Sequence, residues 1–419
     1  MRRWSSYLCV VAAGVAAFYA ATSPKSIPAL DSASAGGFDA ELISRGAALA
    51  AIGNCDSCHT AQDGARLAGG RGIPTPFGTV YSTNITPDRD SGLGLWSAAA
   101  FQRAMREGIS RDGHYLYPAF PYDHFTRVAA EDDRALYAYL MSRPSVRASA
   151  RDNSLWLPLR SRRLVGLWNQ FFLKKGLQAV DPRQTAEWNR GAYLVNGLGH
   201  CGACHTPRNL WGAERANHPL AGSRVEGWDA YALNGASPAP DPWTVESLAA
   251  YLQAGWHTAH GVAHGPMAAV TDDLSRVAGP DVHAMSVYIA SNMPGRQAAE
   301  RRRRTEVEAG SGSLIFAASC ANCHEGSEAP PFGGIDLASS SAVNAPEPRN
   351  MIVTMLAGVP AADGRPAGMM PGFDGAISDE DLAALLRFLR ARFSDKPAWS
   401  NLETRIQAAR RELQNTGQS

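Results

Sequence analysis

The 419-residue sequence has few cysteines, and they are not spread along the chain as a disulfide framework would be. Six of the seven fall into three Cys-x-x-Cys pairs, and only Cys9 lies outside them, within an apolar N-terminal stretch. Small domains that depend on disulfides are much richer in cysteine. This scarcity excludes a disulfide-stapled fold, and we interpret Cys9 as a small apolar residue.

An excess of charge of either sign is also missing. The chain has 40 Lys and Arg against 39 Asp and Glu, which gives a formal net charge of +1. Charged residues make up 19% of the chain, below the usual share of about a quarter. Nucleic-acid binding normally requires a clear positive excess, so we predict no nucleic-acid partner.

Long apolar runs are scarce, and the longest is short for a spanning helix, which needs about 20 residues. This run, residues 7–21, follows Arg2 and Arg3. A basic start followed by about 15 apolar residues is typical of a secretory signal. We therefore predict that residues 1–23 are an export signal or a retained membrane anchor. The protein is then expected on the periplasmic side of the bacterial inner membrane.

Each cysteine pair is followed directly by a histidine. Cys-x-x-Cys-His is the attachment pattern of c-type haem, in which both thiols add to the vinyl groups and the histidine becomes the proximal iron ligand. A redox Cys-x-x-Cys or half of a zinc site would be alternatives for a single copy, but three complete copies disfavour both. The predicted attachment residues are Cys55, Cys58, His59, Cys201, Cys204, His205, Cys320, Cys323 and His324. Attachment of haem to two thiols requires an extracytoplasmic compartment in bacteria, which agrees with the N-terminal segment.

The repeat extends beyond the pentapeptide. A helix is predicted from about residue 39 to 52, and its Arg-Gly-Ala at 45–47 recurs at 190–192, with a weaker version at 312–316. Later in each repeat a helical pattern ends at a glycine, as helices often do; these are Gly108, Gly255 and Gly358. A last helix then has one apolar face. Its aromatic residue is predicted to pack on the first helix of the same repeat, and these aromatics are Tyr139, Tyr288 and Phe388.

We therefore predict a mainly α chain with three tandem class I-like cytochrome c domains joined by linkers. The predicted domains span residues 39–142, 186–293 and 309–393. The linker at 143–185 contains a basic and apolar stretch, which we expect either to pack across the neighbouring domains or to lie on a membrane or partner surface. Residues 394–419 are predicted to be a C-terminal arm that docks on the body or on a partner.

The number of residues after each helix-ending glycine can be used to locate the second axial ligands of the haem irons. Met267 lies twelve residues after Gly255, and Met370 lies twelve residues after Gly358. Methionine is a common sixth ligand of electron-transfer haems. We predict that the two methionines occupy equivalent positions and ligate the second and third haems. The alternatives are a core methionine that fills a gap and, for the third haem, the neighbouring Met369.

In the first repeat, the same spacing of twelve residues leads from Gly108 to Phe120. Phenylalanine cannot ligate iron. His124, four residues further on, is the preferred sixth ligand of the first haem. His114, Met105 and an open coordination position remain alternatives. Two histidine ligands would give this haem a lower potential than its methionine-ligated neighbours.

Three longer stretches carry a family likeness, namely residues 75–88, 116–122 and 204–209. Together with the order of the haem motifs, they resemble the tri-haem cytochrome c subunit of bacterial membrane-bound dehydrogenases. Family members commonly have Ala-Met-Pro-Tyr where this chain has Ala-Phe-Pro-Tyr at 119–122. The resemblance covers nearly the whole chain after residue 39.

The resemblance implies an electron-transfer subunit rather than an enzyme. Its partner would be a catalytic subunit that oxidises an alcohol or aldehyde, either a quinoprotein, a flavoprotein, or a molybdopterin subunit with an iron–sulfur subunit. Electrons would pass through three covalent haems to ubiquinone in the inner membrane, and bound ubiquinone is the one further ligand suggested. The alternatives are a multihaem peroxidase that uses an open first haem, and a redox or gas sensor, for which no output domain is seen.

Overall fold

The computed structural model describes residues 18–19, 22–30, 37–293, 307, 309–325, 334–360 and 369–416. Contacts divide the chain into two compact units: unit 1 holds residues 1–184, 192–203 and 210–213, and unit 2 holds residues 185–191, 204–209 and 214–419. Most of the predicted signal or anchor, residues 1–17 with 20 and 21, lies outside the described residues. Within the described part, none of the helices has the length and apolar character needed to span a bilayer.

Helices dominate the described residues, as the sequence predicts. We refer to residues 39–142, 186–293 and 309–393 as segments 1, 2 and 3. Segment 1 contains α2 (Ala40–Ile52), α3 (Cys55–His59), α4 (Ala98–Glu107), α5 (Tyr122–Phe125) and α6 (Ala130–Met141). Segment 2 contains α8 (Ala186–Asn196), α9 (Cys201–His205), α10 (Val245–Ala254), α11 (Pro266–Leu274) and α12 (Gly279–Asn292). Segment 3 contains α13 (Ser311–Ser319), α14 (Ala321–His324), η1 (Leu337–Ser339), α15 (Ser341–Asn344), α16 (Arg349–Ala357) and α17 (Asp379–Phe393).

The first helix begins where the sequence predicts. Asp39 is the N-cap of α2, and its carboxylate accepts a hydrogen bond from the backbone N–H of Glu41. This bond satisfies one of the backbone donors that a helix start leaves without a partner. The helix continues to Ile52, directly before the first haem motif.

The first and last helices of each segment make the same close contact. A methyl group added to Gly46 of α2 would overlap the carbonyl oxygen of Ala135 on α6. The same overlap would occur between Gly191 and Ala284, and between Gly312 and Ala384. Glycine lets the two helix backbones touch where any side chain would separate them. The sequence repeat at these glycines is therefore a repeated helix crossing.

The predicted aromatic packing is confirmed at the same crossings. A β-carbon built on the crossing glycine would lie 2.7 Å from Cβ of Tyr139, 2.9 Å from Cβ of Tyr288 and 3.0 Å from Cβ of Phe388. Each aromatic residue thus sits against the first helix of its own segment. In segment 2 the ring of Tyr288 also packs edge-to-face on Trp188 of α8, with ring centroids 5.0 Å apart.

Short strands, which the sequence analysis does not predict, lie between the helices. They form three small antiparallel sheets. Their members are β1 (Gly72–Thr75), β2 (Gly78–Tyr81) and β3 (Ser154–Leu155); β4 (Ser223–Val225) and β5 (Trp228–Ala230); and β6 (Trp256–His257) and β7 (Gly261–Val262). These strands are two to four residues long, too short for an alternating pattern to be recognised in the sequence.

The predicted linker is structured and packs on segment 1. Leu155 of β3 pairs with Gly78 of β2. Helix α7 (Arg162–Phe172) places Val165 in a small core with Tyr115, and the hydroxyl of Tyr122 donates a 2.7 Å hydrogen bond to Oδ1 of Asn169. Residues 154–172 are therefore part of the body of unit 1 and not an extended connection.

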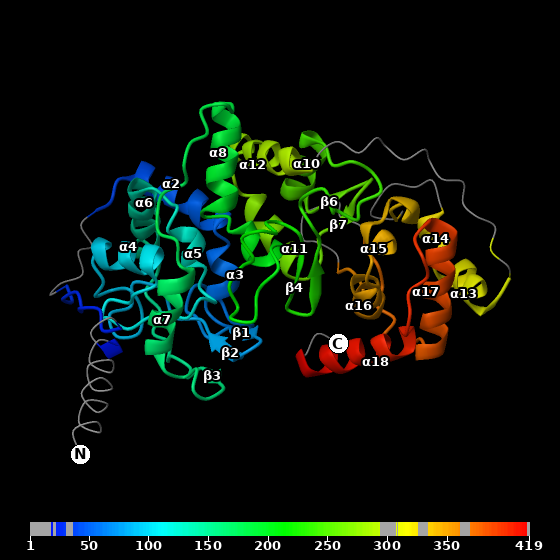
Figure 1. The fold of residues 1–419 in the computed structure, drawn as a ribbon, viewed down its shortest axis with the longest axis horizontal. Coiled ribbons are helices and arrows are strands. Elements are labelled where there is room, and N and C mark those ends of the chain that lie inside the picture. Colours follow the sequence, from blue (N-terminus) through cyan, green and yellow to red (C-terminus); the bar gives the residue numbers. More distant parts are fainter. Residues whose placement is uncertain are drawn as a thin grey trace, which may run out of the picture. The chain divides into compact units, whose positions relative to one another are not determined.

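The C-terminal arm docks on segment 3. Helix α18 (Leu402–Thr416) contacts α16 and α17 and runs crosswise to α17 (Figure 1). Its apolar face joins the main core of unit 2 through Leu402, Ile406, Ala409 and Leu413. Before the helix, the indole N–H of Trp399 donates to the carbonyl of Ala345 at 3.1 Å. Of the two predicted docking sites, the structure shows the body.

Candidate haem sites

The three Cys-x-x-Cys-His motifs each form a short helix. The first two are α3 and α9, and in the third Cys320 precedes α14. One helical turn brings both cysteines of a pair to the same side of the chain. None of the six cysteines forms a disulfide. The local geometry therefore matches what attachment of one porphyrin edge to two thiols requires.

Each motif histidine is held by a backbone carbonyl through Nδ1. The distances are 2.6 Å from His59 to Thr83, 2.6 Å from His205 to Tyr231 and 3.0 Å from His324 to Ile335. A carbonyl oxygen only accepts hydrogen bonds, so Nδ1 carries the proton and Nε2 carries the lone pair. Histidines that ligate metals are usually oriented in this way by their second nitrogen. All three residues thus fit the role of proximal haem ligand.

The short strands and glycines bring these carbonyls into place. Thr83 follows the β1–β2 hairpin and Tyr231 follows the β4–β5 hairpin. In segment 3 a close turn does the same, because a β-carbon on Gly334 would lie 2.8 Å from Nδ1 of His324. The stretch at 75–88 therefore contributes a backbone acceptor to the first site.

The protonation states of two motif histidines suit iron ligation. Burial lowers the pKa of His59 and His205, which keeps both imidazoles neutral, as a ligand requires. Burial, together with the neighbouring Cys58, raises the pKa of the Cys55 thiol to about 12. Burial also raises the pKa of Cys320. A redox Cys-x-x-Cys needs the opposite shift, towards the thiolate, so the redox alternative is disfavoured.

Helices α4, α10 and α16 end at the predicted glycines. The loops that follow them carry candidate sixth ligands, and we call them the distal loops. Gly108, Gly255 and Gly358 have φ angles of 62°, 76° and 75°, in the left-handed region that favours glycine. In segments 1 and 2 the next turn is the same. The N–H of Leu116 donates to the carbonyl of Gly108, and that of Ala263 donates to the carbonyl of Gly255, both at 2.7 Å. The twelve-residue spacing therefore leads to equivalent positions in these two segments, and Phe120 corresponds to Met267.

In segment 3 the same spacing leads to a different position, and the predicted equivalence of Met267 and Met370 is wrong. Trp256, one residue after its glycine, pairs with Val262. Val359, one residue after its glycine, pairs instead with Met370 itself. Met370 therefore takes the hydrogen-bonding position of Val262, while Met267 lies on the first turn of α11. Equal spacing along the chain does not give equal positions, because the two loops close at different points.

The structure separates Met370 from its competitor. Met370 is partly buried and packs against the core of unit 2, whereas the side chain of Met369 is 62% exposed. Only the former points into the protein interior, where an axial ligand belongs. This burial favours Met370 over Met369 for the third site.

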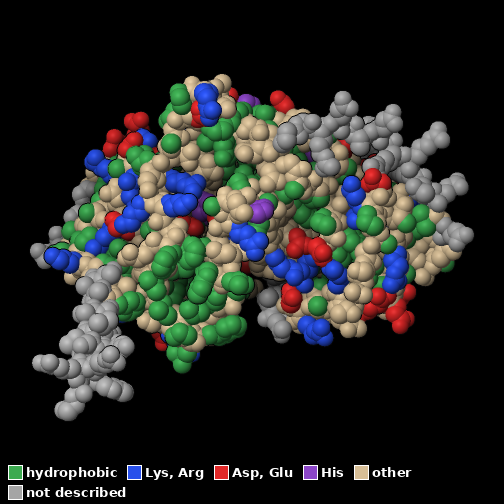
Figure 2. Space-filling view, viewed as in Figure 1, with side chains coloured by type: hydrophobic (Ala, Val, Ile, Leu, Met, Phe, Trp, Pro, Cys, Tyr) green, Lys and Arg blue, Asp and Glu red, His purple; other side chains and the backbone are tan. Residues whose placement is uncertain are grey.

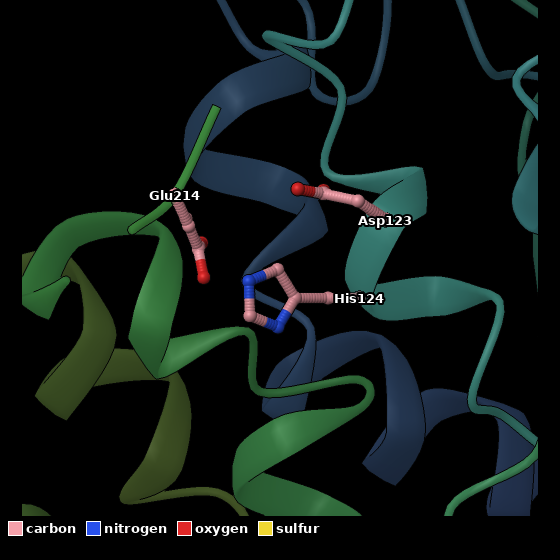
Figure 3. Close-up of side chains that lie close together, drawn as sticks. All are labelled: Asp123, His124 and Glu214. Carbon is pink, nitrogen blue, oxygen red and sulfur yellow. The ribbon is translucent and has the colours of Figure 1, made fainter. Parts of the chain in front are cut away.

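The candidates for the first site also differ. His124 lies on α5 beside Asp123 (Figure 3). It is 4% exposed, and its Nδ1 lies 2.9 Å from the carbonyl oxygen of Asn196. His114 is paired with Asp112 at 2.6 Å, and its side chain is 39% exposed. Met105 is 5% exposed in the core face of α4. His124 therefore shares the carbonyl-bonded Nδ1 of the motif histidines, and unlike His114 it is buried.

Comparisons with known proteins find cytochrome c relatives. Residues 309–392 match the family model described as cytochrome c. A nicotinate dehydrogenase component from Pseudomonas putida is 45% identical over 383 residues, which cover 90% of this chain. The chain spans only 32% of that longer relative.

The fructose dehydrogenase cytochrome subunit of Gluconobacter japonicus is 33% identical and is covered over 80% of its length, with 85% of this chain aligned. The gluconate 2-dehydrogenase cytochrome c subunit of Pantoea cypripedii is 33% identical, with 86% of each chain covered.

The chain belongs to the family of dehydrogenase cytochrome c subunits.

Membership in this family confirms the resemblance to cytochrome c subunits of bacterial dehydrogenases, and the count of three haems stays a prediction. It implies a role in electron transfer. The peroxidase alternative is not favoured, because the relatives are named as dehydrogenase subunits.

Sequence reasoning missed the three carbonyls that orient the motif histidines. Thr83, Tyr231 and Ile335 lie well downstream of their histidines, at different separations. A backbone acceptor leaves no side-chain signal, so no residue type marks these positions. The glycine-containing hairpins before Thr83 and Tyr231 were the only local sign of a turn there.

Proposed function

We propose that this cytochrome c subunit carries electrons through three covalently bound c-type haems, from a periplasmic dehydrogenase catalytic subunit to ubiquinone in the inner membrane. The observation that carries this proposal is the threefold motif histidine, each with its Nδ1 proton on a backbone carbonyl. Membership in the family of dehydrogenase cytochrome subunits supports the direction of electron flow.

The residues divide into attachment, proximal and distal roles. When bound, haem c supplies reversible one-electron iron chemistry. The six motif cysteines would hold the porphyrin as thioethers, and the three motif histidines would present Nε2 to the iron. Met267 and Met370 are the distal ligands that we propose for the second and third sites, and His124 for the first. The neutral state of His59 and His205 avoids a competing proton on Nε2.

The catalytic partner is proposed to oxidise an alcohol or aldehyde. The relatives belong to nicotinate, fructose and gluconate dehydrogenases. The partner is accordingly either a molybdopterin subunit with an iron–sulfur subunit, or a quinoprotein or flavoprotein. In each case the partner supplies the electrons, and this chain passes them on.

An exposed apolar surface on unit 1 supports membrane association (Figure 2). We call it the α7 surface. Its members are all at least 68% exposed, and they are Trp156 (68%), Leu157 (79%), Phe171 (72%), Leu210 (93%) and Trp211 (70%). The indole of Trp168 on α7 donates to the carbonyl of Trp211, and the N–H of Trp156 donates to the carbonyl of Phe77. Phe77 connects the two contacts, since a β-carbon on Gly212 would lie 2.9 Å from its ring. Apolar patches of this kind mark protein or membrane contacts.

The charge around the α7 surface favours a lipid surface over an apolar protein. The flanking cations are Arg160, Arg162, Arg163, Lys174 and Lys175. Cations beside aromatic residues suit a bilayer with anionic headgroups. Arg163 also donates to the carbonyl of Thr22 and to the hydroxyl of Ser23, at 3.3 and 2.5 Å. The predicted export or anchor segment therefore joins the body beside this surface.

Purification from membranes in mild detergent tests the proposed function. We expect co-purification of a catalytic subunit, reduction of the haems by its substrate, and reoxidation by a soluble ubiquinone analogue. Identification of the partner distinguishes the molybdopterin, quinoprotein and flavoprotein classes. Peroxide turnover by the isolated subunit, without haem reduction in the complex, would contradict the proposal and favour the peroxidase alternative.

A further inference from the structure

His264 joins the distal loops of segments 2 and 3 within unit 2. It lies three residues before Met267, and its Nε2 is 2.7 Å from the carbonyl oxygen of Gly358. Its Nδ1 accepts a hydrogen bond from the N–H of Gly265 at 3.0 Å. The ring must therefore be the neutral tautomer with its proton on Nε2, which donates to Gly358. Burial lowers the pKa of His264 and maintains this neutral form.

The acceptor belongs to the peptide group that also holds Met370. The carbonyl of Gly358 and the N–H of Val359 are two ends of one peptide unit. That N–H donates to the carbonyl of Met370 at 2.8 Å, and the N–H of Met370 donates back to Val359 at 3.0 Å. A single planar peptide therefore accepts from His264 and donates to Met370. Hydrogen bonds in such a series polarise and strengthen one another.

Close packing fixes the His264 side of this connection. The ring of His264 lies on Trp228 of β5, with ring centroids 4.6 Å apart. A β-carbon on Gly265 would lie 2.5 Å from Nε1 of Trp228, and the φ of Gly265 is +54°. The loop thus rests directly on the indole, and only glycine allows it to do so.

The β4–β5 hairpin that carries Trp228 is itself bound to α16. The N–H of Asp229 donates to Oδ1 of Asn350, and Nδ2 of Asn350 donates to the carbonyl of Asp229, both at 2.8 Å. Nε of Arg349 donates to the carbonyl of Gly227 at 2.6 Å. The hairpin continues to Tyr231, whose carbonyl orients His205. One rigid assembly therefore contacts the proximal side of the second site and the distal side of the third.

We propose that His264 is a positioning residue that couples the second and third haem sites, by fixing the Met370 loop against the Met267 loop through the Gly358–Val359 peptide. This inference rests on the proposed roles of Met267 and Met370 as distal ligands. It assigns to His264 a role that differs from haem ligation. Two hydrogen bonds and one peptide group connect His264 to Met370.

The test uses the full-length subunit with its haems bound and the variant H264F. Phenylalanine keeps a ring against Trp228 but removes the Nε2 donor. We expect three haems per chain, as in the wild type, with a several-fold slower electron exchange between the second and third haems after rapid photoreduction. The midpoint potential of the third haem should shift, and that of the first haem should not.

Two further variants keep the test decisive. H264Q retains an amide donor and should preserve more of the exchange rate than H264F. H264L, which also lacks the donor, replaces H264F as the test if that variant does not fold, with the same expected and overturning results. His218→Phe alters an exposed histidine of the same unit and should leave all potentials unchanged. Unchanged exchange and potentials in folded H264F, whether or not its thermal stability falls, overturn the proposal. A wild-type protein with fewer than three haems, or without methionine-ligated iron in its spectrum, would instead refute the proposed ligands.

Discussion

At the scale of single residues, the sites are defined by what the second nitrogen of each histidine contacts. The three motif histidines and His124 all place Nδ1 on a backbone carbonyl. This arrangement selects the tautomer with the lone pair on Nε2, the form that binds iron. His114, which pairs with Asp112, lacks this arrangement. The contrast gives a physical reason for preferring His124 in the first site.

Replacing His124 tests that preference. In H124A we expect the first ferric haem to lose its low-spin signal with two histidine ligands, because the buried imidazole is gone. Low-temperature magnetic resonance and near-infrared spectra of the purified protein measure this change. His114→Ala is the matched control and should leave the spectra as in the wild type. An unchanged first-haem spectrum in H124A would exclude His124 as the ligand.

The adjacent methionines of segment 3 allow a second test. M370L should abolish the methionine–iron signal of the third haem and lower its midpoint potential by about 0.1 V, within the roughly 0.8 V range that axial ligands set. M369L is the matched control, because the Met369 side chain is 62% exposed. Spectroelectrochemical titration reports both variants. The opposite pattern, with loss of the signal only in M369L, would reassign the ligand.

At the scale of elements, the repeated helix crossing depends on a glycine in each segment. Gly46, Gly191 and Gly312 each face a backbone carbonyl on the last helix. An ion pair supports the first two crossings, from Arg45 to Asp132 and from Arg190 to Asp281. These pairs are partly exposed, so their contribution to stability is small. The close backbone contact is the feature common to all three crossings.

Adding one methyl group at a crossing should therefore be costly. We expect G191A to lower the free energy of unfolding by about 1–3 kcal/mol, the usual cost of overpacking a rigid interior. Thermal unfolding of the haem-loaded protein, followed by circular dichroism, measures the loss. Gly279 on the partner helix α12 has only the flexible Gln253 side chain near it, at 3.9 Å, so G279A is the control. Equal stability of G191A and the wild type would show that the helices can separate freely.

Helix α7 has two faces with different environments. Its inner face packs on segment 1 through Val165 and Asn169, while Phe171 on its outer face is 72% exposed. The packing of the inner face on segment 1 agrees in part with the first interpretation of this stretch, and a contact of the outer face with a membrane or partner stays a prediction. The inner face explains why the helix is ordered, and the outer face is the one available to a membrane.

The α7 surface predicts weaker lipid binding when its aromatics are removed. We expect W156S and F171S each to weaken binding to anionic vesicles roughly fivefold, about 1 kcal/mol for partial burial of an aromatic ring. Co-sedimentation with phosphatidylglycerol-containing vesicles measures the affinity. L314S removes an equally exposed apolar residue of unit 2 and serves as the control. If L314S weakens binding as much as the other two, the α7 surface is not the membrane contact.

At the scale of the whole molecule, the three segments and the C-terminal arm account for most of the described residues. The arm fills the core of unit 2 with Leu402, Ile406 and Leu413. The linker at 154–172 completes unit 1.

The haem count is the prediction that belongs to this scale. The wild-type chain should bind three haems, and a C320A/C323A double variant should bind two, because each pair of thiols attaches one haem independently. Mass spectrometry of the intact protein, together with the pyridine haemochrome absorbance, measures the ratio. The equivalent C55A/C58A variant should also lose one haem. A wild-type ratio of two would contradict the tri-haem assignment.

From the sequence alone the helical class and the helix-ending glycines could be predicted, and the three attachment motifs stay a prediction that local pattern carries. These depend on local chemistry: five contiguous residues bind one haem, and φ > 0 after a helix requires glycine. The tertiary structure alone decided which carbonyls orient the histidines and how the Met370 loop closes. It also decided where α18 docks and that His264 meets Gly358. These contacts join residues far apart in the chain, and backbone acceptors such as Thr83 leave no trace in residue type.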